Sequence, residues 1–224
     1  GSGCQIFNTK LIDVQTAPLP YITTVSCSGN WSDINNWEQG AIWDITGSHP
    51  ESAIVHVKGN LQTSSSHKMV GLILDNGSKL TVNGDNEINN SWYLKLDGEI
   101  DLQNESQLVQ GADSSLDVTS SGTLERDQQG TKDFYTYNYW SSPVGLTNNS
   151  TNNNAYDVTD VFTNVTFSGS GYNGSASPLT IADYWIWKFS NLPSDDYSSW
   201  QHVRSTGTLQ IGEGFTMKGP GSGP

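Results

Sequence analysis

Short runs in which apolar and polar residues alternate recur at equal intervals through the middle of the chain. Residues 72–82 (LILDNGSKLTV), 94–102 (LKLDGEIDL) and 116–124 (LDVTSSGTL) each begin with two apolar residues separated by one position. Each run then passes through a turn that contains glycine and returns to apolar positions, and the three starts lie 22 residues apart. Residues 55–61 (VHVKGNL) form a looser earlier copy. This pattern predicts short strands joined by corners.

A repeat of fixed length is typical of solenoids, in which one coil cannot bury its own inward face and neighbouring coils share a core. The alternation predicts the inward side chains Leu72, Leu74, Leu80 and Val82. The turn glycines Gly77, Gly98 and Gly122 are expected to supply the positive φ that a corner needs. A meander of antiparallel hairpins would give the same alternation, but the equal spacing favours stacking. We therefore predict a short parallel β-solenoid.

Three tryptophans precede the repeats at an even spacing: Trp31, Trp37 and Trp43. The end of a solenoid exposes its core and needs a cap, and three indole rings would cover much apolar surface. They could instead form a platform on which sugar rings stack. Core or cap is the commoner place for tryptophan, so the sequence predicts a Trp-capped solenoid and leaves the platform as the alternative.

The repeat is lost after residue 130, where a different unit is expected. We expect a strand pair in residues 158–169, a strand at 184–189 with Trp185 and Trp187 on one face, and a closing strand pair in 207–219. These elements predict a small β-sandwich or open sheet that packs on the solenoid end. The chain is thus predicted to be all-β, with an N-terminal segment at 1–30, the solenoid at 31–130 and the second β domain at 131–224.

Residues 135–145 (YTYNYWSSPVG) place three tyrosines on one side of an expected strand, Tyr135, Tyr137 and Tyr139. Such a row suits either a sugar-stacking platform or the buried face of a sheet. The alternation and the neighbouring domain favour sheet residues that are buried on at least one edge of the junction. Pro143 has no backbone N–H to donate, so the strand is expected to end before it.

Acidic residues outnumber basic ones by 23 to 10, which gives a formal net charge of −13 over 224 residues. Such a surface repels phosphate backbones and anionic lipid headgroups, and the chain has no long apolar run. We therefore expect neither nucleic-acid binding nor membrane insertion. Calcium is a candidate cofactor because it prefers carboxylate and carbonyl oxygens, with Asp195 and Asp196 as candidate ligands. Acidity that only keeps a secreted protein soluble is the simpler explanation.

The chain has two cysteines, Cys4 and Cys27, which are too few for a disulfide scaffold or a Cys-based zinc site. A disulfide between them would restrict the unfolded chain and contribute roughly 3 kcal/mol. Such a bridge requires an oxidising compartment. The sequence leaves open whether it forms.

No catalytic motif stands out, because neither an HExxH metal spacing nor a G-x-S-x-G elbow occurs. We predict that the chain is not an enzyme. Two alternatives to a structural role stay open. One is a carbohydrate-binding module, with Trp185, Trp187 and Trp200 as its candidate residues. The other is a polysaccharide-degrading enzyme, which would need carboxylates held in a cleft.

Two stretches carry a resemblance to a known family: YWSSPVG at 139–145 and GEGFTMKG at 212–219. With the Trp-rich opening and the repeats, they resemble a module of very large Bacteroidetes (flavobacterial) surface proteins exported by the type IX secretion system. That family includes long adhesins similar to the gliding-motility adhesin SprB. The resemblance covers roughly residues 28–219, and members usually continue beyond the last stretch.

The resemblance implies a non-catalytic structural or adhesion segment that presents or spaces a binding region at the outer cell surface. It implies surface polysaccharide, or another cell-surface component, and the type IX export apparatus as partners. An export route of this kind would permit the Cys4–Cys27 bridge. The chain is accordingly expected to be a piece of a longer secreted protein.

Overall fold

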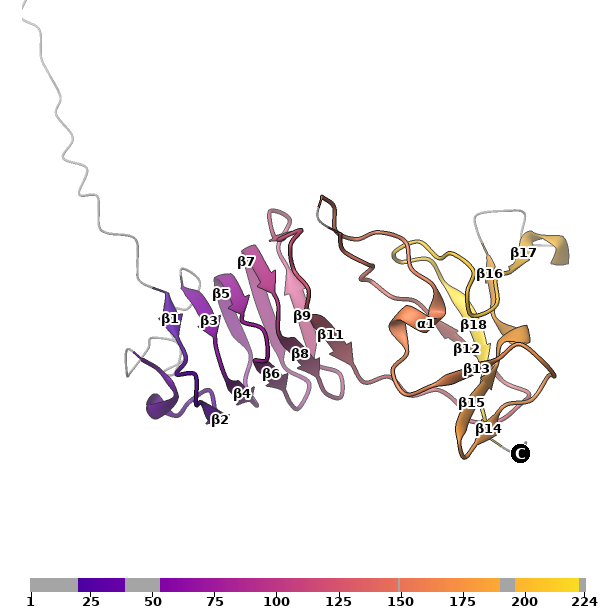
Figure 1. The fold of residues 1–224 in the computed structure, drawn as a ribbon, viewed down its shortest axis with the longest axis horizontal. Helices are drawn as coiled ribbons and strands as arrows, with labels where there is room; N and C mark the ends of the chain where they lie inside the picture. The colour runs from indigo at the N-terminus through magenta and orange to yellow at the C-terminus, as the bar shows by residue number, and fades with distance from the viewer. Residues whose placement is uncertain (1–19, 39–52, 149, 190–195, 222–224) are drawn as a thin grey trace, which may run out of the picture.

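Strands with alternating inward and outward side chains build a parallel solenoid between residues 21 and 126 (Figure 1). The structure is a computed structural model that describes residues 20–38, 53–148, 150–189 and 196–221. One sheet contains β1 (Tyr21–Ile22), β3 (Ile54–Val57), β5 (His67–Leu74), β7 (Glu87–Leu96) and β10 (Ser115–Leu116), with β9 (Gln107–Gln110) also paired to β7. The other contains β2 (Ser28–Asn30), β4 (Asn60–Thr63), β6 (Lys79–Val82), β8 (Glu99–Leu102) and β11 (Thr123–Arg126).

The pairing register confirms the predicted solenoid. Val55 lies beside Leu72, Leu72 beside Leu94, and Leu94 beside Leu116, all in parallel pairs. Val55, Leu72 and Leu94 are each buried, as are the other predicted inward residues Leu74, Leu80 and Val82. Because successive coils from Val55 to Leu116 contribute an aliphatic side chain at the same position, the side chains form continuous rows through one core.

The solenoid begins earlier than the predicted boundary at residue 31. β1 pairs with β3, and β2 pairs with β4, so residues from Tyr21 onward already belong to a coil. Only the part of the predicted N-terminal segment before residue 20 lies outside the described residues.

The corner glycines act in two different ways, and the prediction of positive φ holds for only one of them. Gly77 has a φ of +80°. At Gly98 a Cβ atom would lie 2.5 Å from the carbonyl oxygen of Ser78, and at Gly122 it would collide with the backbone of Gly98. Gly98 and Gly122 are therefore required because successive corners stack backbone on backbone, and their own conformation does not demand glycine.

Two of the three tryptophans close the first coil, as predicted for a cap. Trp31 and Trp37 are buried in the solenoid core, with ring centroids 5.1 Å apart in an edge-to-face arrangement. Trp31 also stacks on the ring of His67 at 4.1 Å, and the indole N–H of Trp37 donates to the Trp31 carbonyl at 2.8 Å. These rings do not form a sugar platform. Trp43 lies outside the described residues.

The second domain contains two further sheets, which confirms a separate β unit after the solenoid (Figure 1). An antiparallel sheet has the order β12 (Tyr137–Trp140), β18 (Phe215–Lys218), β16 (Trp187–Phe189) and β17 (Trp200–His202). A smaller sheet has the order β13 (Thr166–Ser168), β15 (Leu179–Ala182) and β14 (Ser175–Ala176). Their common core contains Tyr156, Val158, Ile181, Ile186, Leu209, Phe215 and Met217.

Three element predictions in this domain need correction. Residues 158–169 form the short helix α1 (Val158–Val161) followed by β13, because Asp157 and Asp160 make a capping box that starts a helical turn. Residues 184–189 split into a 3-10 turn, Asp183–Trp185, and β16. In 207–219 only β18 is a strand, whereas Leu209 makes an isolated bridge to Tyr156.

A loop between the two parts covers the last coil of the solenoid. The hydroxyl of Thr147 donates to the Ser120 carbonyl at 3.0 Å, and the side-chain amide of Asn152 donates to the Leu116 carbonyl. A cavity of about 320 Å³ remains beneath this loop, lined on one side by Leu116 and Leu124 and on the other by Val144 and Leu146. The second domain thus contacts the solenoid end through this loop.

Candidate functional site

The three tryptophans predicted to bind carbohydrate are all half-buried in the second domain. Trp187 lies in β16 and Trp200 in β17, whereas Trp185 ends the 3-10 turn that precedes β16. Because Trp185 belongs to the turn, the alternation of side chains between the two faces of a strand does not extend to it. Trp185 and Trp187 therefore do not share one face of a strand, contrary to the prediction.

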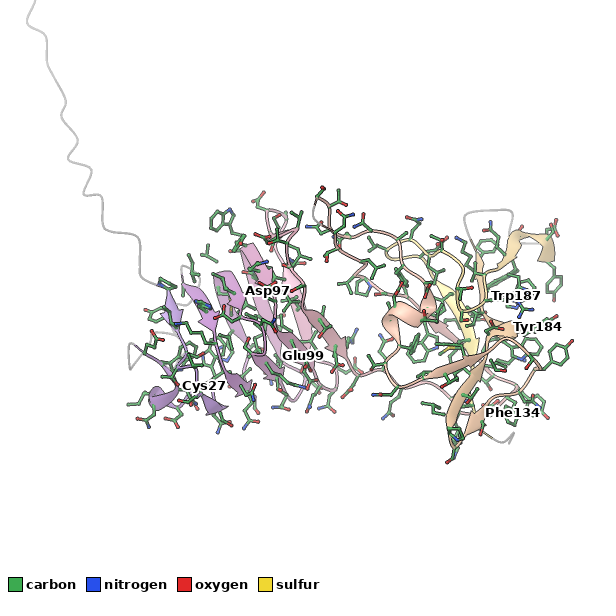
Figure 2. The ribbon with its side chains drawn as sticks, viewed as in Figure 1. Cys27, Asp97, Glu99, Phe134, Tyr184 and Trp187 are labelled. Atoms are coloured by element: carbon green, nitrogen blue, oxygen red, sulfur yellow. The ribbon has the colours of Figure 1, made fainter. Side chains whose placement is uncertain are left out.

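Trp185 and Trp187 instead join a group of aromatic rings centred on Tyr184. We call this group the aromatic cluster; its members are Tyr137, Tyr172, Tyr184, Trp185, Trp187 and His202. The Tyr184 ring lies 4.9 Å from Trp185, 6.3 Å from Trp187, 5.1 Å from His202 and 4.8 Å from Tyr172, in edge-to-face geometry. Figure 2 shows Tyr184 and Trp187 on the side of the second domain that faces away from the solenoid.

Hydrogen bonds and one ion pair fix the backbone beneath these rings. The carboxylate of Asp183, which is buried, accepts from the guanidinium of Arg204 at 3.0 Å and from the hydroxyl of Ser205 at 3.3 Å. The hydroxyl of Thr216 donates to the Trp185 carbonyl at 2.9 Å and accepts from the Trp187 amide at 3.2 Å. The turn and the start of β16 are therefore held from both sides.

The rings also hold one another. The indole N–H of Trp185 donates to the Tyr172 carbonyl at 2.6 Å. Trp187 stacks on His202 with centroids 4.1 Å apart and planes 11° from parallel, across the β16–β17 pair. Aromatic contacts of these geometries are favourable beyond the area they bury, so the cluster has a defined shape without a ligand.

Lys218 places a cation between two rings of the cluster. Its Nζ lies 3.7 Å from the ring centroid of Trp185 and 4.6 Å from that of Tyr137, both within the range of a cation–π interaction. Partial burial lowers the pKa of Lys218, and the charge of Asp133 acts in the opposite direction. Lys218 makes no ion pair with any described carboxylate, whereas Lys188 and Arg204 are paired with Glu213 and Asp183.

The tyrosine row of residues 135–139 faces solvent, which corrects the prediction that it is buried. Tyr135 is 70% and Tyr139 75% exposed, and Tyr137 is 37% exposed. Among the described strands β12 pairs with β18 alone, and Trp140 is the residue of β12 that packs on the core, against Phe162. Burial and the neighbouring phenols of Tyr139 and Tyr184 raise the pKa of Tyr137.

Trp200 lies apart from the centre of the cluster. Its ring contacts Phe189, with centroids 5.5 Å apart, on the far end of the same strand pair. Of the three predicted residues, the structure therefore brings Trp185 and Trp187 together and leaves Trp200 beside them.

Of the two candidate calcium ligands, Asp195 and Asp196, the structure describes only Asp196. Asp196 caps the 3-10 turn Tyr197–Ser199 by accepting from the Ser198 amide at 2.8 Å. Hydrogen bonds from the Ser198 side chain and from its amide lower the pKa of Asp196. Asp195 lies outside the described residues. Calcium binding through these two residues stays a prediction.

A different group of carboxylates gathers on the outer face of the solenoid, where the sequence did not indicate it. One carboxylate oxygen each from Glu99, Asp101 and Glu125 lies within 4.8 Å of the others. The ammonium of Lys79 lies 2.6 Å from Glu99 and 2.9 Å from Asp101. Burial and the adjacent Glu99 raise the pKa of Glu125. The lysine already neutralises part of this group.

The proposed disulfide has one partner among the described residues. Cys27 is buried in the first coil, and its thiol donates to the Asn60 carbonyl at 3.4 Å. Burial raises the pKa of this thiol. Cys4 lies outside the described residues, so the Cys4–Cys27 bridge stays a prediction.

Several members of the cluster were not predicted from the sequence. Tyr172, Tyr184 and His202 come from three separate segments, and Lys218 beside them comes from a fourth. His202 and Lys218 reach the cluster because β16 pairs with both β17 and β18, whereas Tyr172 is held there by the hydrogen bond from Trp185. Lys218 had one usable signal, since it is the polar residue that ends the alternating sequence FTMK of β18.

Comparison of the chain with protein-family models, with curated proteins and with solved structures finds no match. Among the described residues, no helix has the length and apolar character needed to span a membrane. The function is therefore argued from the geometry.

Proposed function

We propose that this chain is a non-catalytic structural and adhesion segment of a long secreted bacterial surface protein, in which the solenoid spaces a binding region from the cell. The observation that supports this proposal is the register of Val55, Leu72, Leu94 and Leu116. A core shared by successive coils resists bending, because a bend would open the contact between neighbouring side chains.

The dimensions agree with a spacer. In each solenoid sheet five strands follow one another along the stack of coils. The four steps between them, of about 4.8 Å each, give a stack length of about 19 Å. The second domain continues along the same long axis (Figure 1). Buried tryptophans at one end and the loop at the other cover the core, so the solenoid does not depend on further coils for burial.

The outer cell surface, the type IX export apparatus and surface polysaccharide belong to this proposal as location and partners, through the resemblance of residues 139–145 and 212–219. The acidic surface supports an extracellular role, because a net charge of −13 favours solubility and self-repulsion. No described helix is suited to span a membrane, and the proposal requires none in this segment.

A replacement experiment tests the spacer role. In the secreted parent protein, residues 21–126 are replaced either by an unrelated solenoid with the same number of coils or by a Gly/Ser linker. A linker of about twelve residues has a root-mean-square span of about 19 Å, so it matches the distance without the stiffness. Attachment of the cells to a surface is measured for each strain.

We expect the unrelated solenoid to retain attachment and the linker to reduce it, because stiffness is the property that the solenoid supplies. Labelling of intact cells with an antibody against this chain provides the location. Full attachment with the flexible linker, or labelling only after the cells are permeabilised, would overturn the proposal.

A further inference from the structure

The aromatic cluster is not part of the hydrophobic core of the second domain. That core is made of Tyr156, Val158, Ile181, Ile186, Leu209, Phe215 and Met217. The cluster residues Tyr184, Trp185 and Trp187 are half-buried, and Tyr172 is 62% exposed. Tyr139, two positions after Tyr137 in β12, is 75% exposed. Exposed aromatic rings gathered in one place usually mark a binding surface.

The rings are arranged to receive a flat apolar surface with polar edges. The face of an aromatic ring carries partial negative charge, and the C–H face of a sugar ring carries partial positive charge. The edge-to-face contacts of Tyr184 hold the neighbouring rings at steep angles, and the phenols of Tyr137, Tyr139 and Tyr184 offer hydrogen bonds beside them. Phenols and ring faces together match the alternation of C–H and O–H groups around a sugar.

Lys218 gives this surface a charge preference. Its ammonium group is partly removed from water between Trp185 and Tyr137, and it has no carboxylate partner within the described part of the chain. A partly desolvated cation binds an anion more strongly than a fully hydrated one does. The ligand that completes this environment carries a carboxylate or a sulfate.

The overall acidity of the chain does not oppose such a ligand at this place. Residues 131–224 contain seven of the 23 acidic residues and four of the ten basic ones, so most of the negative charge belongs to the solenoid half. Near the cluster, Asp183 is neutralised by Arg204 at 3.0 Å. Asp133 is the acidic residue whose charge reaches Lys218, and its carboxylate accepts from the amides of Tyr135 and Thr136.

We propose that the aromatic cluster and Lys218 bind a polysaccharide that carries carboxylate or sulfate groups. Sugar rings pack on the exposed rings of Tyr172 and Tyr139, and an anionic substituent contacts Lys218 Nζ. This assignment deepens the proposed function, since it names the region that the solenoid would present. It is tested independently of the solenoid's stiffness.

Binding is measured with the whole chain and three families of polymer: polyuronates, sulfated galactans and neutral glucans. Each polymer is immobilised, and the dissociation constant is determined at low and at high salt. We expect binding to at least one acidic family, no measurable binding to the neutral glucans, and a loss of affinity at high salt because the contact is charged. The two acidic families distinguish a carboxylate from a sulfate.

Variants locate the site. Lys218→Met is expected to weaken binding about ten-fold, because one charge-assisted contact is lost, whereas Lys218→Arg keeps the charge and most of the affinity. Tyr172→Ala removes an exposed ring and is expected to weaken binding about five-fold. The matched controls are Lys68→Met and Trp92→Ala, which remove an exposed lysine and an exposed tryptophan from the solenoid and should leave affinity unchanged.

Circular dichroism and the melting temperature of each variant show whether it is folded. Equal binding of acidic and neutral polymers would overturn the charge preference. An absence of binding to all acidic polymers, or wild-type affinity in both Lys218→Met and Tyr172→Ala, would overturn the site. Neither result bears on the spacer role, which the replacement experiment measures separately.

Discussion

Shortening Leu94 to alanine tests whether the rows of aliphatic side chains hold the solenoid together. Leu94 is 2% exposed and lies between Leu72 and Leu116 in the parallel register. Leu94→Ala removes three carbon atoms between two coils, where neighbouring backbones are fixed by ladder hydrogen bonds and cannot collapse into the space. We therefore expect a loss of about 3 kcal/mol in the free energy of unfolding, within the range for buried leucines.

Two matched variants give the comparison. Leu116→Ala makes the same chemical change in the last coil, where the side chain is half-buried. We expect about 1.5 kcal/mol there, because less apolar area is removed from contact. Ile73→Ala makes a similar change on the outward side of β5, next to the buried Leu72, and about 1 kcal/mol is expected for a half-buried side chain.

Hydrogen exchange measured by mass spectrometry separates the two domains. Peptides from residues 67–102 report the solenoid, and peptides from residues 156–217 report the second domain. In Leu94→Ala, a loss of about 3 kcal/mol corresponds to about 150-fold faster exchange of the most protected solenoid amides. An effect no larger than that of Ile73→Ala would contradict the shared core and remove the physical basis of the spacer role.

Three further predictions follow from the corners, the carboxylates and the joint. Gly122→Ala should lower the melting temperature more than Gly77→Ala. A Cβ atom at residue 122 would collide with the backbone of Gly98, whereas a Cβ atom at residue 77 has open space and meets only an unfavourable φ. Equal effects of the two substitutions would refute the stacked-corner explanation. Glu125→Gln should stabilise the chain at pH 7. The raised pKa of Glu125 means that the folded state favours its protonated form, so the folded state loses stability as the pH rises above the ordinary glutamate pKa of 4.5. Urea titrations at pH 3 and pH 7 test this, and an advantage of the variant that is the same at both pH values would contradict it. Asn152→Ala should increase protease cleavage within residues 143–153 while both domains keep their exchange protection, because Asn152 fastens this loop to the Leu116 carbonyl; unchanged cleavage would show that the bond does not hold the loop.

The solenoid could be predicted from the sequence because the same pattern of apolar and polar residues recurs in each coil. The same alternation occurs in successive coils, so an error at one position is corrected by its neighbours, and Leu72, Leu94 and Leu116 indicate both the strand and its register. The role of Gly98 and Gly122 could not be predicted in this way. Their requirement for glycine comes from the distance to the preceding corner, which depends on how the coils are stacked.

The second domain shows the limit of alternation as a signal. The row of Tyr137 and Tyr139 alternates with Asn138 and Trp140, and a period of two does not say which face is buried. The structure buries the face with Trp140, because that ring reaches Phe162 while the side chain of Asn138 accepts from the Thr131 amide. At residues 183–186 a 3-10 turn replaces the expected strand: the Ile186 amide donates to the Asp183 carbonyl, and the Asp183 carboxylate is held by Arg204.

The candidate site was half predictable for a related reason. Trp185 and Trp187 were selected for their residue type, and two tryptophans so close in sequence lie near each other in most conformations. His202 and Lys218 join them through antiparallel pairings between segments that have no repeat to indicate their register. Tyr172 joins them from a loop, through the hydrogen bond from Trp185. Residue type therefore pointed to the chemistry, while the choice of neighbours depended on the tertiary structure.

Contacts between the loop after β12 and the last coil of the solenoid restrict how the second domain, with its aromatic cluster, can move relative to the solenoid. The loop that leaves β12 lies over Leu116 and Leu124, and turning the second domain away would expose these half-buried side chains together with Val144 and Leu146. The hydrogen bonds of Thr147 and Asn152 end on carbonyl groups of the last coil, so the same movement would also leave those groups without their partners. Both costs oppose free rotation, and a load applied at the aromatic cluster is therefore carried into the solenoid through this contact as well as through the chain.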